Sequence, residues 1–240
     1  MTLWDHLFFV VVFFAIPIYF WRTNQSWVAE VDSRGEPARI AGYRETIAIW
    51  LVAALALGVL WVTTGREWSA LGMRLSNPPK FVLGVALSLS IVALMWWQLR
   101  LMMSKVFDGQ VTRDSLRNHI GGTEALVPGT QREHRWFRAL SINAGITEEL
   151  IYRGFLLWYL EPMVGLPIAV ALAIALFAFG HCYQGLKQLP GIAVAAGVMV
   201  ALYLISGSIW LPMLVHATID ALQGELFGKK LQARPSEAGS

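Results

Sequence analysis

The sequence has little cysteine and little charge, and it lacks several familiar binding motifs. Its one cysteine is Cys182, so the chain can form neither an internal disulfide framework nor a multi-cysteine metal site. Charged residues make up 15% of the chain, whereas soluble domains contain roughly 25%. The motifs G-x-G-x-x-G and H-E-x-x-H do not occur, and neither does a P-loop. These absences argue against a nucleotide-binding loop and against a zinc protease of the H-E-x-x-H class.

What the sequence has in abundance is apolar residues, which are 56% of the chain and are gathered in blocks. Each block is long enough to cross a hydrocarbon core about 30 Å thick. The blocks should be helical, because backbone groups in lipid must be satisfied within the segment. The sequence therefore predicts an all-α, polytopic transmembrane helix bundle of about seven spanning helices, with room for an eighth within 106–140. The seven segments are 3–21, 45–64, 81–103, 142–160, 163–182, 189–206 and 208–227.

Loop charges predict how this bundle sits in a membrane. Most loop arginines and lysines fall on one predicted side, and only Arg66, Arg74 and Lys80 fall on the other. The positive-inside rule then places the N-terminus outside and the C-terminus in the cytoplasm. Basic loops account for the net charge of +3 without a nucleic-acid partner. The segment "QREHRWFRALSIN", which begins at Gln131, is typical of an amphipathic helix on the cytoplasmic membrane surface.

Ionisable residues inside predicted spans are the main signal for function. The stretch "GITEELIYRGFLLWYL" begins at Gly145 and carries Glu148, Glu149 and Arg153. Each such residue costs roughly 2.5–3.5 kcal/mol on insertion scales and usually marks a functional site. Glu149 and Arg153 are four residues apart and can form an ion pair on one helix face. Glu148 has no obvious local partner, which makes it a candidate general base.

Two later spans add polar residues at a similar depth. Phe177 and His181 lie four residues apart in "LFAFGHCYQG", and His216 and Asp220 lie four apart in "LPMLVHATIDALQGEL". Taken singly, each histidine could be a hydrogen-bonded structural residue. The predicted topology, however, places both histidines at the depth of Glu148, in the cytoplasmic half of the bilayer. This convergence favours a shared functional site.

The residue types limit the chemistry of such a site. Glu148, His181 and His216 could together hold zinc, so a metal stays open, although the sequence requires no cofactor. A paired-aspartate mechanism would have only Asp220, and a serine at the depth of either histidine is lacking. A water molecule activated by Glu148, with histidines around it, fits best.

Three motifs in order carry a family resemblance. "EELIYR" at 148–153 matches E-E-x-x-x-R, "FAFGH" at 177–181 matches F-x-x-x-H, and "HATID" at 216–220 is similar to H-x-x-x-N or D. Over residues 128–223 the chain resembles the CAAX-protease and bacteriocin-processing (CPBP) family of intramembrane endopeptidases. The resemblance implies that Glu148 activates water and that His181 binds or orients it.

The resemblance also implies roles for the remaining motif residues. Glu149, Arg153 and Phe177 would support the site, while His216 and residue 220 would stabilise the oxyanion of the tetrahedral intermediate. Asparagine is the more usual residue at this last position, and an ionised Asp220 would repel an oxyanion. Asp220 could serve there only when protonated, or it could orient His216 instead.

The sequence thus predicts an intramembrane endopeptidase that acts on peptides of membrane-associated or CAAX-like proteins in a lipid bilayer. Residues 1–127 would form N-terminal helices and a cytoplasmic loop, 128–227 the catalytic domain, and 228–240 a disordered tail. The lack of appended domains favours a bacterial inner membrane. Two alternatives stay open: an inactive immunity or scaffold protein of the same fold, and a transporter, although the inverted repeats typical of transporters are not evident.

Overall fold

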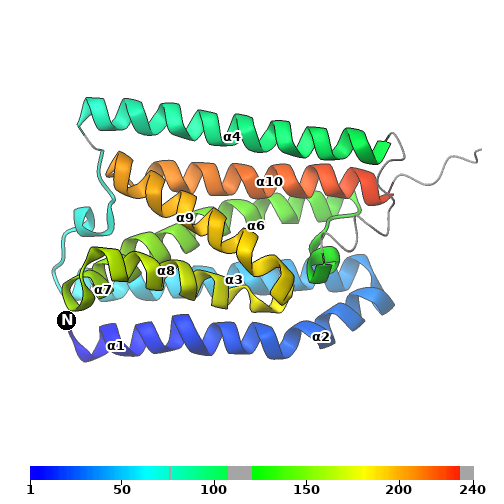
Figure 1. The fold of residues 1–240 in the computed structure, drawn as a ribbon. Helices are drawn as coiled ribbons and strands as arrows, with labels where there is room; N and C mark the ends of the chain where they lie inside the picture. Colours follow the sequence, from blue (N-terminus) through cyan, green and yellow to red (C-terminus); the bar gives the residue numbers. More distant parts are fainter. Residues whose placement is uncertain (76, 108–120, 233–240) are drawn as a thin grey trace, which may run out of the picture.

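The computed structural model describes residues 1–75, 77–107 and 121–232, and in these ranges the chain is helical and contains no strand. The long helices run side by side along one direction (Figure 1). The elements are α1 (Leu3–Val10), η1 (Val11–Ala15), α2 (Ile16–Arg34), α3 (Glu36–Thr63), η2 (Trp68–Leu71), α4 (Pro78–Phe107), η3 (Gly121–Leu126), α6 (Gln131–Glu149), η4 (Leu150–Leu156), α7 (Leu157–Val164), α8 (Leu166–Gly180), η5 (Cys182–Gln184), η6 (Leu186–Gln188), α9 (Leu189–Ser206) and α10 (Trp210–Gln232). The predicted all-α bundle is confirmed.

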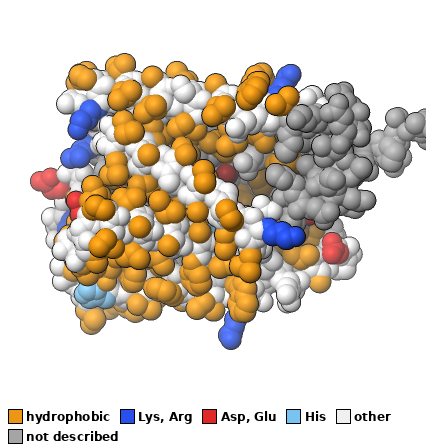
Figure 2. Space-filling view, viewed as in Figure 1, with side chains coloured by type: hydrophobic (Ala, Val, Ile, Leu, Met, Phe, Trp, Pro, Cys, Tyr) orange, Lys and Arg blue, Asp and Glu red, His pale blue; other side chains and the backbone are white. Residues whose placement is uncertain are grey.

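Four helices of the described chain are long and apolar enough to cross a membrane. They span Leu3–Arg34, Glu36–Thr63, Pro78–Leu101 and Leu186–Ser206. Hydrophobic side chains cover most of the face in Figure 2, and charged side chains gather mainly toward its two ends. This belt is what a lipid-facing surface requires, and the protein is an integral membrane protein. The other three predicted segments are also helical, but they are shorter or carry the charges of the candidate site.

The basic and aromatic segment at Gln131 is not a separate surface helix, which corrects the sequence-based expectation. It begins α6, which continues through the π-helical turns of η4 into α7 and ends before Gly165. Thr130 caps the start, since its hydroxyl accepts from the Glu133 amide at 3.1 Å and the Glu133 carboxylate accepts from the Thr130 amide at 2.8 Å. Nothing after this cap breaks the helix, so surface segment and span form one rod.

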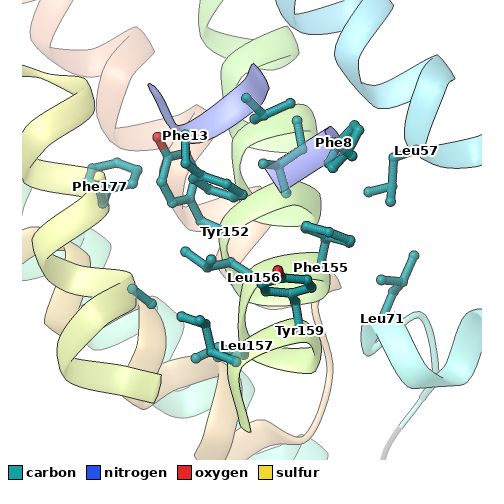
Figure 3. Close-up of a cluster of buried hydrophobic side chains, with 14 of the residues drawn as sticks. Phe8, Phe13, Leu57, Leu71, Tyr152, Phe155, Leu156, Leu157, Tyr159 and Phe177 are labelled. Carbon is teal, nitrogen blue, oxygen red and sulfur yellow. The ribbon is translucent and has the colours of Figure 1, made fainter. Parts of the chain in front are cut away.

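The middle of this rod is the best-buried part of the molecule. Ile151, Phe155 and Leu156 in η4 are fully buried, and Phe8 packs edge-to-face on Phe155 with ring centroids 4.7 Å apart. Side chains from η1, α3, η2 and α8 complete the cluster shown in Figure 3. The charged residues beside η4 are therefore enclosed on several sides by helices rather than by lipid.

Each end of the bundle is held by an ion pair between an arginine and a buried carboxylate, here called a clasp. At the end that holds the N-terminus, both Arg66 terminal nitrogens bind the Asp5 carboxylate, at 2.6 and 2.7 Å. At the other end, Arg39 binds Glu133 at 2.6 Å and also donates to the Ala125 carbonyl at 2.8 Å. The second clasp ties α3 and η3 to the first turn of α6, and so sets the position of the rod.

Residues 1–127 pack directly on the later part of the chain, because α3 lies along α6 and α4 lies along α10. Helix α10 continues to Gln232, five residues into the predicted tail, and residues 233–240 lie outside the described range. The division into domains at residue 128 stays a prediction.

Candidate active site

Glu149 is the centre of the charged cluster. Its Oε1 atom accepts from Arg153 Nη1 at 3.0 Å and from His216 Nδ1 at 2.8 Å. Arg153 also donates from Nη2 to the Ala196 carbonyl of α9 at 3.1 Å. The contacts of Arg153 are buried and the His216 contact is part-buried, so the cluster joins the rod to α9 and α10 with little exposure of its charges.

The close approach of α6 to α10 explains how His216 reaches Glu149. A Cβ atom on Gly145 would lie only 2.7 Å from the Ala217 backbone nitrogen and Cβ atom. Glycine is therefore needed where the two backbones meet, one turn before Glu149 and next to His216. The contact sets the distance between the two helices at the depth of the site.

Asp220 follows His216 by one helical turn on α10. Its Oδ2 atom lies 3.5 Å from His216 Nε2, a longer contact than the one between His216 Nδ1 and Glu149. The two imidazole nitrogens thus face two different carboxylates. The hydrogen bond from Nδ1 to Glu149 fixes the ring of His216, whereas the contact between Nε2 and Asp220 is longer and therefore weaker.

His181 lies at the end of α8, where its Nδ1 atom is 2.8 Å from the Phe177 carbonyl. That carbonyl can only accept, so Nδ1 carries the proton and Nε2 is left as an acceptor in the neutral ring. Phe177 also supplies the ring around which the site is arranged. Four side chains surround it at centroid or cation–ring distances from 4.5 to 6.4 Å: Tyr152, Arg153, His181 and His216.

Glu148 differs from its neighbour Glu149. Its side chain is 7% exposed, and among the described residues it forms no hydrogen bond and no ion pair. It nevertheless lies within electrostatic reach of His216, Asp220 and Arg153. An acidic group that is buried near cations but is not bound by them remains able to exchange a proton.

Comparison with protein families identifies the segment that holds this cluster. Residues 132–222 match the family described as "Type II CAAX prenyl endopeptidase Rce1-like". This segment is similar to the Rce1-like proteases. That family is part of the CPBP proteases, which confirms the resemblance inferred from the motifs. Comparisons with curated proteins and with solved structures return no match.

All seven motif residues lie in the Rce1-like segment, and the structure brings them together. The pair Glu149–Arg153, expected from the spacing, is present. The hydrogen bond from His216 to Glu149 was missed, because it joins residues 67 positions apart on different helices. Tyr152 was missed too, although its place four residues after Glu148 put it on the same helix face.

The loop after α8 contributes a further aromatic residue to the Rce1-like site. The Tyr183 ring stacks on His181 with centroids 6.2 Å apart. Desolvation raises the pKa of the Tyr183 phenol to about 12, and the Glu148 and Asp220 carboxylates act in the same direction. Tyr183 is therefore protonated at neutral pH and can donate a hydrogen bond.

Two hollows lie outside the motif cluster. An apolar groove of about 700 Å³ runs along α6 and α10 past Ile142, Ile146 and Leu214, and a polar hollow of about 600 Å³ adjoins it at Arg138 and Glu225. None of the seven motif residues lines either one. Among the described residues, no group of three or more histidine, cysteine or acidic side chains is arranged to hold a metal ion.

Proposed function

We propose that this protein is an intramembrane endopeptidase in which Glu148 activates a water molecule. The observation that carries the proposal is the contrast between two adjacent glutamates. Glu149 is bound by Arg153 and His216, whereas Glu148 is buried beside the same groups and has no bond within the described chain. Glu149 then serves the structure of the site, and Glu148 is available for proton transfer.

In the proposed reaction, Glu148 removes a proton from water while the water oxygen attacks the carbonyl carbon of the scissile peptide. His181 assists by accepting a hydrogen bond at Nε2 from the second water hydrogen, which stays on the oxygen, since the Nδ1 proton of His181 is engaged with the Phe177 carbonyl. The tetrahedral intermediate that results carries its charge on the former carbonyl oxygen. Glu148 then passes its proton to the amide nitrogen and the C–N bond breaks, so that a carboxylic acid and an amine leave and Glu148 is ionised again.

His216 is the proposed donor to the oxyanion. Glu149 fixes the ring by accepting from Nδ1, and in the doubly protonated ring the Nε2 proton can be directed at the reacting oxygen. Asp220 Oδ2 lies 3.5 Å from His216 Nε2, and a carboxylate at this place would repel an oxyanion. We assign Asp220 to orienting His216 rather than to binding the oxyanion.

The proposed substrates are peptides of membrane-associated or CAAX-like proteins. The similarity of residues 132–222 to the Rce1-like family supports this class, and the enclosed position of Glu148 among apolar helices supports a substrate that enters from the bilayer. Basic residues are more numerous in the loops on the side of the C-terminus, which supports an N-terminus outside and a site toward the cytoplasm. We place the protein in a bacterial inner membrane.

The test compares the terminal peptides of membrane proteins in cells that carry the wild-type protein or Glu148→Gln. New termini that appear only with the wild type would support proteolysis and would identify the substrate and the cleaved bond. Identical termini, with the variant stably present, would contradict it in favour of an inactive protein of the same fold. Adding a chelator, and then zinc, to the purified wild type tests separately whether a metal takes part.

A further inference from the structure

The Tyr152 side chain has a polar group that its surroundings do not explain. The side chain is 1% exposed, and its hydroxyl oxygen has no hydrogen-bond partner among the described residues. Buried polar groups are almost always paired, so each exception calls for a reason. Packing alone does not supply one, because phenylalanine would fill the same space without burying a hydroxyl.

The neighbours of the Tyr152 ring are aromatic and cannot pair with the hydroxyl. Phe13 lies edge-to-face at 5.1 Å and Phe177 at 4.9 Å, and the ring of Trp50 lies at 6.3 Å. Figure 3 shows Tyr152 between Phe13 and Phe177. These contacts hold the ring in place, so the direction of its hydroxyl is set by packing rather than by a hydrogen bond.

The Tyr152 hydroxyl points toward Gly180, the residue before His181. A Cβ atom on Gly180 would lie 2.8 Å from the Tyr152 hydroxyl oxygen, so glycine leaves the room that the hydroxyl occupies. Phe177, whose ring contacts Tyr152, also stacks on His181 at 4.5 Å. Tyr152 shares a helix face with Glu148, four residues earlier. The hydroxyl thus lies at the residue before His181, on a side chain that shares a helix face with Glu148.

We propose that the Tyr152 hydroxyl binds a water molecule beside Glu148 and His181 and acts as a positioning residue for the attack. A phenol can donate one hydrogen bond and accept others, so it can hold water that also contacts a carboxylate and an imidazole nitrogen. The role of this water in attack rests on the proposed function. Tyr152 does not exchange protons with the substrate; it restricts where the water oxygen lies relative to Glu148.

The experiment measures kcat and KM of the full-length protein in lipid vesicles, with a peptide substrate identified from the termini described above. Tyr152→Phe removes only the hydroxyl and is expected to lower kcat by about tenfold or more, with KM within about twofold. Tyr159→Phe is the matched control, because the Tyr159 hydroxyl is bonded to His6 Nδ1 at 2.6 Å, away from the cluster. Wild-type kcat in Tyr152→Phe would overturn the proposal, and so would an equal loss in the control.

A second readout does not depend on turnover. The infrared difference spectrum between wild type and Tyr152→Phe, in vesicles in H₂O and D₂O, isolates the O–H group of this one phenol. A band of a hydrogen-bonded phenol that exchanges with D₂O supports a bound water, and a band of a free phenol overturns it. If the wild type cleaves nothing, the proposed function fails and takes with it the role in attack, while this spectrum still decides whether the water site exists.

Discussion

The bundle has two clusters of charged residues, one at its end and one at its centre. Each contains an arginine bound to a carboxylate, but they differ in how many of their polar atoms have a hydrogen-bond partner. In the end clasp, Asp5 is 0% exposed and every carboxylate oxygen is bound, by Arg66 on both atoms and by the Thr2 hydroxyl at 3.0 Å. The Arg66 guanidinium lies over the rings of Trp61 and Trp158, at 5.1 and 4.5 Å. This cluster leaves its acid no capacity for another partner.

The central cluster is left incomplete. Glu149 Oε2, Arg153 Nε and the Tyr152 hydroxyl are buried and have no partner among the described residues, and Glu148 is not bound at all. Unpaired buried polar atoms destabilise a protein, so their concentration in one place indicates that something else completes them. Both clusters contain buried charge. The candidate active site differs from the structural clasp in having buried polar atoms without a hydrogen-bond partner.

The largest expected effect is on the rate when Glu148 is changed. Glu148→Gln should lower kcat by about 10²–10⁴-fold, the usual contribution of a general base. Its melting temperature should stay equal to that of the wild type or rise, because a buried group without a partner is made neutral. Cleavage assays in vesicles and thermal melts check the two parts. A variant that unfolds would assign Glu148 to structure and erase its contrast with Glu149.

The second prediction concerns the free energy of unfolding, to which we expect Arg153 to contribute strongly. Arg153→Met leaves Glu149 buried with a charge that only His216 can balance, which should cost about 3–5 kcal/mol of unfolding free energy. Arg153→Lys is the matched control, since it keeps the charge and should lose less. Unfolding curves in detergent micelles measure the difference. Equal stability of Arg153→Met and the wild type would show that the central cluster is not held together as described.

The end clasp should affect stability but not the rate per folded molecule. Asp5→Asn removes the charge that Arg66 binds on both oxygens and should cost about 2 kcal/mol of stability, the scale of hydrogen bonds to charged groups. The same unfolding curves, combined with kcat corrected for the folded fraction, test this. A fall in the corrected kcat would mean that the clasp and the site are coupled, which the comparison does not predict.

The smallest effect is expected at Asp220. Asp220→Asn should change kcat by less than about tenfold, or roughly 1.4 kcal/mol, because an amide oxygen can still accept from His216 Nε2. His216→Ala, the reference variant at the same assay conditions, should lose far more. A loss in Asp220→Asn as large as that in His216→Ala would assign Asp220 a direct part in the reaction.

The sequence predicted the helical bundle and that the motif residues lie near one another, but not every hydrogen bond between them. The spacing of Glu149 and Arg153 was enough to predict their contact, since helix geometry alone determines it. The bond between Glu149 and His216 depends on how α6 packs on α10 at Gly145, which membrane depth does not specify. The charges after Gln131 indicated a surface helix, because hydropathy does not show that a helix continues beyond the lipid.

That continuity has a mechanical consequence. The rod comprises 19, 7 and 8 residues in turn, and at about 1.5 Å per residue it is roughly 50 Å long, against a hydrocarbon layer of about 30 Å. The rod is therefore longer than this layer is thick; Arg39 holds its first turn, and Glu148 lies near its midpoint. A force applied at Glu133 is transmitted along one continuous helix to Glu148, with no loop in between to absorb it.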